Sequence, residues 1–230
     1  DIFINLASNS RSKSQSIDDL RSITDFNITM STYLVDIAIS CKVTKIINVS
    51  SNWAYLSNQF DPSFFNYYAF TKHALDKYIA HACSKSLTKG VSLVLYDNFD
   101  KYDPRNKIFN IIEKAVRNSE RTNFSPGKQI INLTRMDDIA LALKYITTLK
   151  SWEFDTFQYY QISGQEISIL QLANFIQEIY NKKNDILNFG GFPYREGEIM
   201  QPKYFFDELP YIGNRKKDIF DLIKQELQKP

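Results

Sequence analysis

The sequence predicts an α/β fold, built on a doubly wound parallel sheet with helices on both faces and completed by a smaller mixed α/β part. Short apolar runs alternate with longer amphipathic stretches, which is the pattern of strands followed by crossover helices. The apolar runs are continuous, as suits parallel strands covered on both faces. The amphipathic stretches are long enough to cross back over a sheet, and such connections are nearly always right-handed. Together these observations predict half of a doubly wound sheet.

The first half of the chain alternates strands with helices. Three apolar runs bounded by polar residues are expected to be strands, namely Ile2–Ala7, Lys45–Ser50 and Val91–Tyr96. Between them, two stretches carry apolar residues near helical spacing, Ile23–Cys41 and Asn66–Ser84. Each stretch is expected to be a helix that connects two parallel strands.

The second half of the chain is more mixed. The helices expected there are Lys107–Asn118, Met136–Leu149, Ile169–Tyr180 and Lys217–Leu227. The expected strands are Gln129–Leu133 and Tyr159–Ile162. Two glycines and a proline within Phe189–Pro193 supply conformational freedom and a fixed φ but no regular ladder, so this segment is expected to be irregular.

Composition excludes several classes of function. The chain has 230 residues, 43% of them apolar, and 28 basic residues against 26 acidic ones give a net charge of +2. This near balance lacks the electrostatic footprint of non-specific nucleic-acid binding. No run of 18 apolar residues and no signal peptide occurs, so we expect no membrane span. The chain begins at Asp1 and enters directly on an apolar run, which indicates the middle of a protein.

The metal-ligating residue types are scarce. Cys41 and Cys83 are the only thiols, which argues against a disulfide scaffold or a cysteine zinc site and predicts a reducing, cytoplasmic environment. His73 and His81, the only histidines, are eight residues apart on one predicted helix, too far for a ligand pair on adjacent turns. We therefore expect no metal site. None of the seven glycines lies in a glycine-rich turn between a strand and a helix, so the usual phosphate cradle for a dinucleotide is missing from these residues.

The sharpest chemical signal is a tyrosine four residues before a lysine on a predicted helix. Tyr68 and Lys72 share one helix face, and an ammonium beside a phenol favours the phenolate form that proton exchange needs. Ser51 leaves the carboxyl end of the preceding strand, where open α/β sheets place ligands, and could donate a hydrogen bond to a carbonyl or alkoxide. The alternative is that Tyr67 and Tyr68 only pack in a helix interface. The serine pair at the strand end favours a carbonyl-reduction site.

These motifs resemble the extended short-chain dehydrogenase/reductases that act on nucleotide sugars, within the NAD-dependent epimerase/dehydratase family. The resemblance runs over essentially the whole chain and implies a truncated Rossmann-like sheet. The matching segments are Asp1–Ser8, Asn27, Ile46–Ser51, and the pair Tyr68 and Lys72. A narrower resemblance is to the branch that contains the CDP-abequose and CDP-paratose synthases. It rests on residues 51–53, 67–72, 95–97, 103–107 and 192–200.

The resemblance implies roles for the catalytic and cofactor-binding residues. Tyr68 would be the acid/base, Lys72 its electrostatic partner and a ligand of the nicotinamide ribose, and Ser51 the hydrogen-bond donor to the carbonyl. The cofactor, NADP or NAD, would be bound by Tyr68 and Lys72 together with Leu6, Ala7 and Tyr96.

The resemblance also implies substrate-binding residues. Arg195, in the loop that matches the Arg-x-Gly-Asp/Glu pattern, would hold the pyrophosphate of the sugar nucleotide, a role suited to a forked and permanently charged donor. Asp97 would approach the sugar, and Trp53 would line the pocket. Arg105 and Lys107 are further substrate candidates, and a solvated charge pair at the start of a helix is an equal alternative for both.

Two departures from the family pattern are visible. Relatives carry Tyr-Gly-Pro where this chain reads Phe99-Asp100-Lys101, so the shape of that loop is not predicted. The first three strands of the family, with their glycine-rich fingerprint, have no counterpart. We expect residues 1–124 to be the C-terminal portion of a cofactor-binding domain, and residues 125–230, intermixed with it, to be mainly the substrate-binding part.

The resulting functional expectation is an NAD(P)-dependent reductase of the 4-keto group of a CDP- or other NDP-linked 4-keto-6-deoxyhexose, used in surface-polysaccharide synthesis such as that of the O-antigen. Alternatives are a nucleotide-sugar 4-epimerase or dehydratase, and a truncated, non-catalytic sugar-nucleotide-binding remnant. A dehydratase would place an acidic residue just after Ser51, where this chain has Asn52-Trp53. The resemblance further implies a homodimer packed through the helices near 23–41 and 66–84.

Overall fold

The computed structural model describes residues 1–10, 16–56, 66–182, 185–210 and 217–229. By its internal contacts the chain divides into two compact units. The first unit comprises Asp1–Leu95, Tyr145–Ile162 and Lys203–Leu209. The second comprises Tyr96–Lys144, Ser163–Pro202 and Pro210–Pro230. The chain thus passes between the units several times, and residues 96–124 group with the second unit.

The first unit contains a four-stranded parallel sheet. Its strands are ordered β1 (Ile2–Asn5), β2 (Lys45–Ser51), β3 (Lys89–Leu95) and β7 (Phe157–Ile162). The parallel sheet is the architecture that the sequence predicts, and all four strands were expected. β1 ends two residues earlier than expected and β3 ends one residue earlier, so Leu6, Ala7 and Tyr96 lie just beyond the carboxyl ends of strands.

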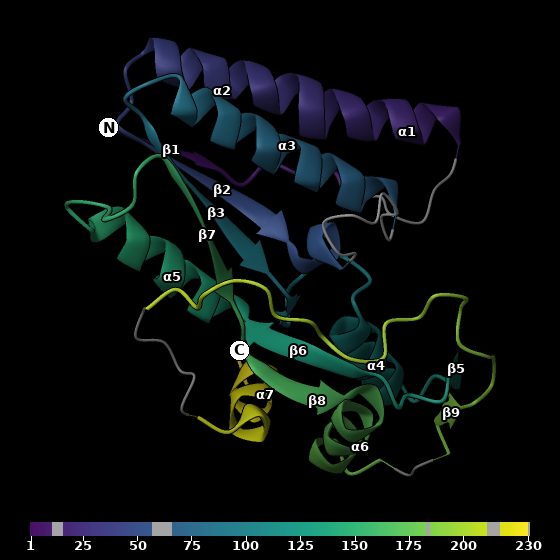
Figure 1. Cartoon of the computed structure of the whole chain (residues 1–230). Coiled ribbons are helices and arrows are strands. Elements are labelled where there is room, and N and C mark those ends of the chain that lie inside the picture. Colours follow the sequence, from purple (N-terminus) through teal and green to yellow (C-terminus); the bar gives the residue numbers. More distant parts are fainter. Residues whose placement is uncertain (11–15, 57–65, 183–184, 211–216, 230) are drawn as a thin grey trace. The chain divides into compact units, whose positions relative to one another are not determined.

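Helices α1 (Ile17–Thr24), α2 (Ser31–Ser40) and α3 (Tyr67–Ser84) cover one face of this sheet (Figure 1). The apolar face of α3 supplies Leu75, Ile79 and Cys83 to a core with Val35 and Ile46. α3 begins where expected, because the side chain of Asn66 caps its first turn by accepting the Ala69 N–H at 2.8 Å.

The prediction of one continuous helix over 23–41 is wrong in two respects. The helix begins earlier, at Ile17, where Ser16 is the N-cap. A π-helical turn, Asp25–Met30, also separates α1 from α2. Asn27 within that turn is buried, and its side-chain amide is hydrogen-bonded to both backbone groups of Asn9 and to Thr71. These bonds hold the wide turn, which hydrophobic periodicity alone does not reveal.

The second unit combines short strands with three helices. One sheet has the order β4 (Asp97–Phe99), β6 (Ile130–Arg135) and β8 (Gln165–Ser168), and β5 (Thr122–Phe124) pairs in parallel with β9 (Leu187–Phe189). The helices are α4 (Ile108–Asn118), α6 (Ile169–Ile179) and α7 (Ile219–Leu227), and α5 (Met136–Thr148) runs from the second unit into the first. The helices were expected, whereas β4, β5, β8 and β9 are too short to leave an apolar run.

The core of the second unit packs the apolar faces of α4, α6 and α7 together, with Phe109, Leu172 and Ile223 fully buried in it. Gly164 is required where β7 gives way to β8. A Cβ atom on Gly164 would lie 2.0 Å from the carbonyl oxygen of Leu133, too close for any other residue. Gly127 has φ +72°, which also favours glycine.

Three further findings concern function classes. Within the described residues, no helix is long and apolar enough to cross a membrane. The same residues contain no group of three or more His, Cys, Asp or Glu side chains that could hold a metal ion. Cys41 is exposed and Cys83 is buried, and both are free thiols.

Candidate active site

The catalytic candidates of the first unit come from β2 and α3. β2 ends at Ser51, which is the N-cap of the 3-10 turn Asn52–Tyr55 (η2) and accepts the Trp53 N–H with its side-chain oxygen at 3.3 Å. Accepting that bond leaves the hydroxyl hydrogen of Ser51 for donation to a ligand. Tyr68 lies in the first turn of α3, half-buried.

Trp53 connects these two elements. Its ring meets the ring of Tyr68 edge-on, with centroids 6.4 Å apart. Because Trp53 is only two residues beyond Ser51, this contact packs the turn that carries Ser51 against the start of α3. Trp53 therefore lies beside the acid/base candidate.

Lys72 is placed one helical turn beyond Tyr68 and is 3% exposed. Its ammonium donates a hydrogen bond to the carbonyl of Val49 in β2, at 2.5 Å. Burial lowers the pKa of Lys72 below its ordinary value, and the negative charge of Asp76 acts in the opposite direction. The side chain is thus fixed at the end of β2 on the helix face that also carries Tyr68.

Asp76, which the sequence analysis did not single out, is the most densely bonded side chain of this region. It is fully buried and accepts hydrogen bonds from Asn48, Ser50, Tyr55 and Ser92. Two signals could have found it. It continues the four-residue step from Tyr68 to Lys72, and β2 carries polar side chains at alternate positions of an otherwise apolar strand.

The cofactor-binding candidates follow the carboxyl end of β1. Leu6 is exposed there, and the Ala7 N–H is bonded to the side chain of Asn5 at 3.3 Å. Asn5 in turn donates to Asn48 at 2.9 Å, which ties the end of β1 to β2. A tyrosine and a lysine on one helix face beyond parallel strands are a donor set that suits a nicotinamide ribose. The sequence contains no glycine-rich turn that suits the pyrophosphate of the cofactor. The residues present therefore fit the nicotinamide end of the cofactor.

The second unit brings three of the predicted substrate residues together. Asp97 lies at the start of β4, directly after Tyr96, which is buried. Burial raises the pKa of Asp97, and the positive charges of Lys107 and Arg195 lower it. Both cations therefore lie near one carboxylate although Arg195 is far away in the sequence.

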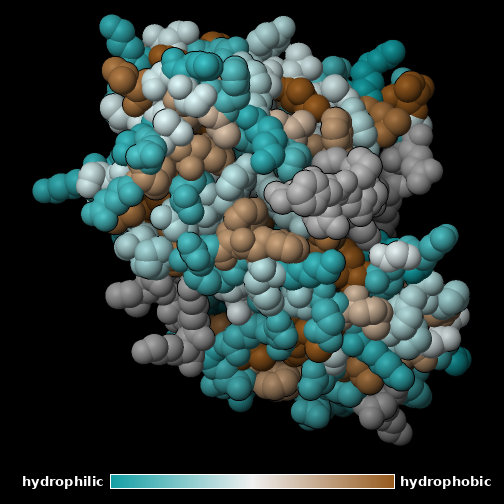
Figure 2. Space-filling model, viewed as in Figure 1, coloured by the Kyte–Doolittle hydropathy of each residue, from teal (hydrophilic) through white to brown (hydrophobic). Residues whose placement is uncertain are grey.

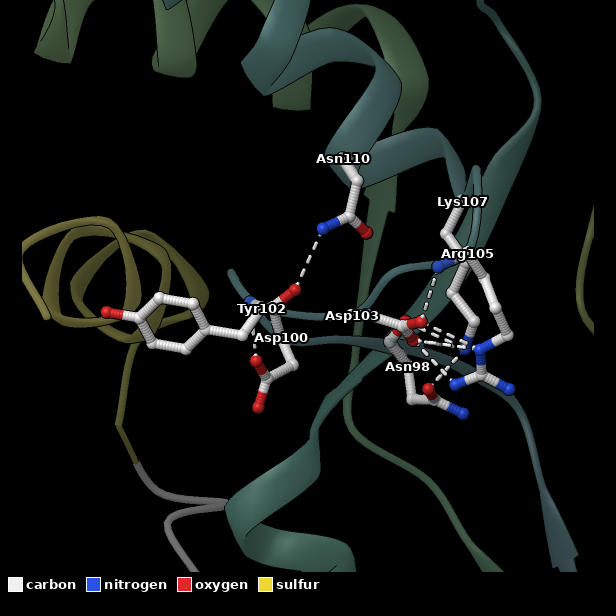
Figure 3. A network of polar contacts seen from close by, with 7 residues as sticks. All are labelled: Asn98, Asp100, Tyr102, Asp103, Arg105, Lys107 and Asn110. Carbon is white, nitrogen blue, oxygen red and sulfur yellow. Dashed lines mark hydrogen bonds and ion pairs between the residues drawn. The ribbon is translucent and has the colours of Figure 1, made fainter.

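Arg105 and Lys107 share one acidic partner, Asp103 (Figure 3). The Arg105 guanidinium forms a two-pronged ion pair with Asp103, its terminal nitrogen at 2.5 Å and its Nε at 2.8 Å. Lys107 lies 3.7 Å from Asp103 and donates to the side chain of Asn98. Burial, followed by the charge of Arg105, lowers the pKa of Lys107 to about 8. Lys107 is the N-cap residue of α4 and half-buried, unlike a freely solvated helix-start charge.

The loop after β4 is closed by side chains rather than by glycine and proline. The carboxylate of Asp100 accepts the Tyr102 N–H at 2.7 Å, which forms a turn between residues two apart (Figure 3). Asn110 of α4 donates to the Asp100 carbonyl at 2.9 Å. Residues 99–101, which depart from the family pattern, therefore still form a defined turn.

Arg195 is 56% exposed and forms an ion pair with Glu198, its Nε at 3.1 Å and its terminal nitrogen also at 3.1 Å. The carboxylate engages two guanidinium nitrogens in the forked geometry that phosphate and carboxylate groups share.

The predicted site residues divide between the two units. The first unit contains Ser51, Trp53, Tyr68 and Lys72. The remaining substrate candidates, with Tyr96, belong to the second. Asn98, the partner of Lys107, was not predicted.

Comparison with known proteins adds to this geometry. Residues 1–154 match the NAD dependent epimerase/dehydratase family. The chain is 28% identical over 218 residues to CDP-abequose synthase from Yersinia pseudotuberculosis, and the match covers 95% of this chain and 75% of that protein.

Solved structures have the same fold. dTDP-glucose 4,6-dehydratase from Streptomyces venezuelae, in a structure with NAD bound, matches with a TM-score of 0.81 at 15% identity, covering 99% of this chain and 72% of that one. UDP-glucuronic acid 4-epimerase from Bacillus cereus, in complex with UDP-glucuronic acid and NAD, matches with a TM-score of 0.77 at 19% identity, covering 98% and 76%. At these identities the likeness shows a Rossmann-like fold.

Proposed function

The chain belongs to the NAD dependent epimerase/dehydratase family, and from this premise we propose that it is an NAD(P)-dependent nucleotide-sugar reductase. The proposed substrate is a CDP-linked, or other NDP-linked, 4-keto-6-deoxyhexose, whose 4-keto group is reduced to an alcohol. Such a sugar would serve surface-polysaccharide synthesis. The observation that carries the proposal is the placement of Tyr68 and Lys72 on one face of α3, with Trp53 joining Tyr68 to the turn of Ser51.

The chain's own residues divide the chemistry between them. A bound nicotinamide cofactor supplies the hydride. The phenol of Tyr68 gives its proton to the developing alkoxide oxygen, and the hydroxyl of Ser51 donates a hydrogen bond to the same oxygen. Lys72 holds a positive charge one helical turn away and favours the phenolate that remains on Tyr68. Lys72 and Tyr68 would also hold the nicotinamide ribose, and Leu6, Ala7 and Tyr96 are the further cofactor-binding residues that we propose.

The second unit supplies the charges for a sugar nucleotide. Arg195 presents a forked donor to the pyrophosphate, and Lys107 adds a second cation near Asp97. Asp97 is suited to accept hydrogen bonds from sugar hydroxyls. The choice of a CDP-linked sugar rests on the 28% identity to a CDP-abequose synthase along 95% of the chain.

A steady-state assay tests this proposal. Purified protein is mixed with NADPH or NADH and a CDP-4-keto-6-deoxyhexose, and absorbance at the nicotinamide band is followed to completion. The reductase consumes one reduced cofactor for each sugar. A 4-epimerase or dehydratase, which returns the hydride to its substrate, changes the sugar with no net consumption, and a non-catalytic remnant changes neither. Either of these two outcomes overturns the proposal.

We further propose that the protein acts as a homodimer through α1–α3. Hydrophobic side chains reach the surface among hydrophilic ones on the viewed face of the molecule (Figure 2). On these helices and the π-helical turn the large exposed hydrophobic residues are Ile17, Phe26, Tyr33, Ile37 and Phe70. Their number on one layer of helices supports a helix-to-helix interface between two copies.

A further inference from the structure

Asp76 continues the line of functional side chains along α3. Tyr68, Lys72 and Asp76 are spaced four residues apart, so they lie on one face of the helix at successive turns. The carboxylate of Asp76 is fully buried. A buried charge is retained only where hydrogen bonds or an opposite charge compensate it.

Between them, Lys72 and Asp76 contact three consecutive residues of β2. The ammonium of Lys72 donates to the carbonyl of Val49, while the carboxylate of Asp76 accepts from the side chains of Asn48, at 2.7 Å, and Ser50. The side chains of alternate strand residues point to one face of a sheet. The two charged groups of α3 therefore hold the last residues of β2 before Ser51 from the same side.

The two oxygens of Asp76 also hold the chain on both sides of Ser51. Oδ2 accepts from Ser50, directly before Ser51, and from the phenol of Tyr55, four residues after it. Oδ1 accepts from Asn48 and from Ser92 of β3. One carboxylate thus connects β2, β3, η2 and α3 around the turn that presents the Ser51 hydroxyl.

The negative charge of Asp76 acts on two neighbouring basic side chains of α3, Lys72 and His73. Burial and, to a smaller extent, the charge of Asp76 raise the pKa of Tyr55. The same two causes raise the pKa of Tyr159 in β7 to about 12. Both phenols therefore stay neutral in the physiological range. The pKa of His73 is lowered by burial and by the charge of Lys77, against the influence of Asp76. Burial lowers the pKa of Lys72, whereas Asp76 raises it. The carboxylate therefore favours a protonated Lys72.

We propose that Asp76 is a positioning residue of this site, which fixes the Ser51 turn and holds the ammonium of Lys72 charged beside Tyr68. The inference rests on the proposed reductase function for its effect on turnover. Its effect on Lys72 is independent of turnover, because the charge of Asp76 acts on Lys72 in the free protein.

The test compares Asp76→Asn with wild type. The amide keeps the shape of the carboxylate, and the hydroxyls of Ser50, Tyr55 and Ser92 can accept as well as donate, so the hydrogen bonds can rearrange while the charge is lost. The proton titration of Lys72 is followed by NMR on ¹³C-labelled lysines of the free protein. We expect Lys72 to lose its proton at a lower pH in Asp76→Asn. With substrate, we expect kcat to fall by about 10²-fold, KM for the nucleotide sugar to change little, and the alkaline limb of the kcat profile to move to lower pH.

Asp36→Asn is the matched control, because Asp36 also accepts a hydrogen bond from a tyrosine of α3, Tyr78, but on the exposed side of the helix layer. It should leave the Lys72 titration and kcat unchanged. An unchanged Lys72 titration in Asp76→Asn overturns the inference. Wild-type protein that oxidises no reduced cofactor instead overturns the proposed function, which the NMR titration does not test.

A second variant covers the case that Asp76→Asn does not fold. Tyr55→Phe removes one donor to Oδ2 and keeps the ring contacts with His73, Tyr159 and Phe206. We expect kcat to fall several-fold because the Ser51 turn loosens, while the Lys72 titration stays near that of wild type. A kcat equal to that of wild type would show that Asp76 does not hold the turn through Tyr55, against the inference.

Discussion

The ring of Trp53 meets the ring of Tyr68 edge-on, at an interplanar angle of 87° and a centroid separation of 6.4 Å. Trp53 stands two residues after Ser51, the proposed hydrogen-bond donor, and Tyr68 is the proposed proton donor. The contact thus joins the two groups that the proposed reaction brings to one carbonyl oxygen, although they are 17 residues apart in the sequence. General acid catalysis depends on such placement within hydrogen-bond reach of the substrate.

Replacement of Tyr68 by Phe should abolish reduction and leave binding of the nucleotide sugar largely intact. The ring that packs on Trp53 is kept and the proton donor is lost, so we expect kcat to fall by about 10² to 10⁴-fold. Stopped-flow or steady-state oxidation of NADPH measures kcat, and calorimetry measures the affinity for a CDP-sugar.

Tyr67→Phe is the matched control for this change. The Tyr67 hydroxyl is bonded to Thr24 Oγ1 of α1, at 2.6 Å, so its loss removes a helix contact and no proposed proton donor. Its kcat should stay within a few-fold of that of wild type. Retained turnover in Tyr68→Phe would refute the role of the phenol.

Nucleotide-sugar affinity should weaken as the pH rises through about 8, because that is the value to which burial lowers the pKa of Lys107. Below this pH the ammonium is charged and attracts the pyrophosphate; above it the attraction is lost. Lys107→Arg stays charged at these pH values and should remove the pH dependence, whereas Lys107→Met should bind weakly at all of them. Calorimetric titrations of CDP between pH 6.5 and pH 9.5 measure the effect, and identical profiles for wild type and Lys107→Arg would contradict it.

The same lysine should affect stability with a definite sign. Its pKa is lower in the folded protein than the ordinary 10.5, so between about pH 8 and pH 10.5 the unfolded chain holds more protons. The contribution of Lys107 to the free energy of unfolding therefore rises with pH in this window. Urea unfolding at pH 7.5 and pH 10 should show a larger gain for wild type than for Lys107→Met. An equal or smaller gain for wild type than for Lys107→Met would contradict the lowered pKa of Lys107.

Arg195→Lys should weaken binding of a CDP-sugar by about tenfold, because a lysine cannot present two parallel N–H donors to a phosphate. Arg195 is held by Glu198 in the free protein, so Glu198→Gln should alter affinity less than Arg195→Lys does. Equilibrium dialysis with labelled CDP-sugar measures both. Unchanged affinity in Arg195→Lys would assign the pyrophosphate to another cation.

Regular elements of the fold could be predicted from the sequence because their apolar residues form a recognisable pattern, either helical spacing or a continuous run. α3, α4 and the parallel strands of the first unit follow this rule. The π-helical turn around Asn27 and the three-residue strands β4, β5 and β9 do not, because they are held by tertiary hydrogen bonds or by partners distant in the chain. Local periodicity contains no record of such partners.

The site divides in the same way. The pair Tyr68 and Lys72 could be found because both residues lie on one helix at a fixed spacing. The charge cluster of Asp97, Lys107 and Arg195 joins residues nearly a hundred positions apart, and only the resemblance to a family indicated it. Asp76 was missed because a single acidic residue in a helix is ordinarily a solvated one, and its burial depends on polar side chains of two strands.

We expect the protein to have twice the 26.8 kDa mass of one chain in solution. Ile37→Glu places a charge on the exposed surface of α2 and should give the mass of a single chain by light scattering. Leu87→Glu, at a fully exposed position after the end of α3, is the control and should leave the mass unchanged. Single-chain mass for the unmodified protein would argue against the dimer.

Transfer of deuterium from NADPH labelled at the nicotinamide C4 position to the sugar tests the proposed reductase most directly. The label is offered with a CDP-4-keto-6-deoxyhexose, and the product is analysed by mass spectrometry and NMR. Reduction at the keto carbon places one deuterium at C4 of the product sugar, and Tyr68→Phe should prevent its appearance. A sugar that is converted without deuterium at C4, or is returned unchanged with the labelled cofactor intact, would contradict the proposed reaction.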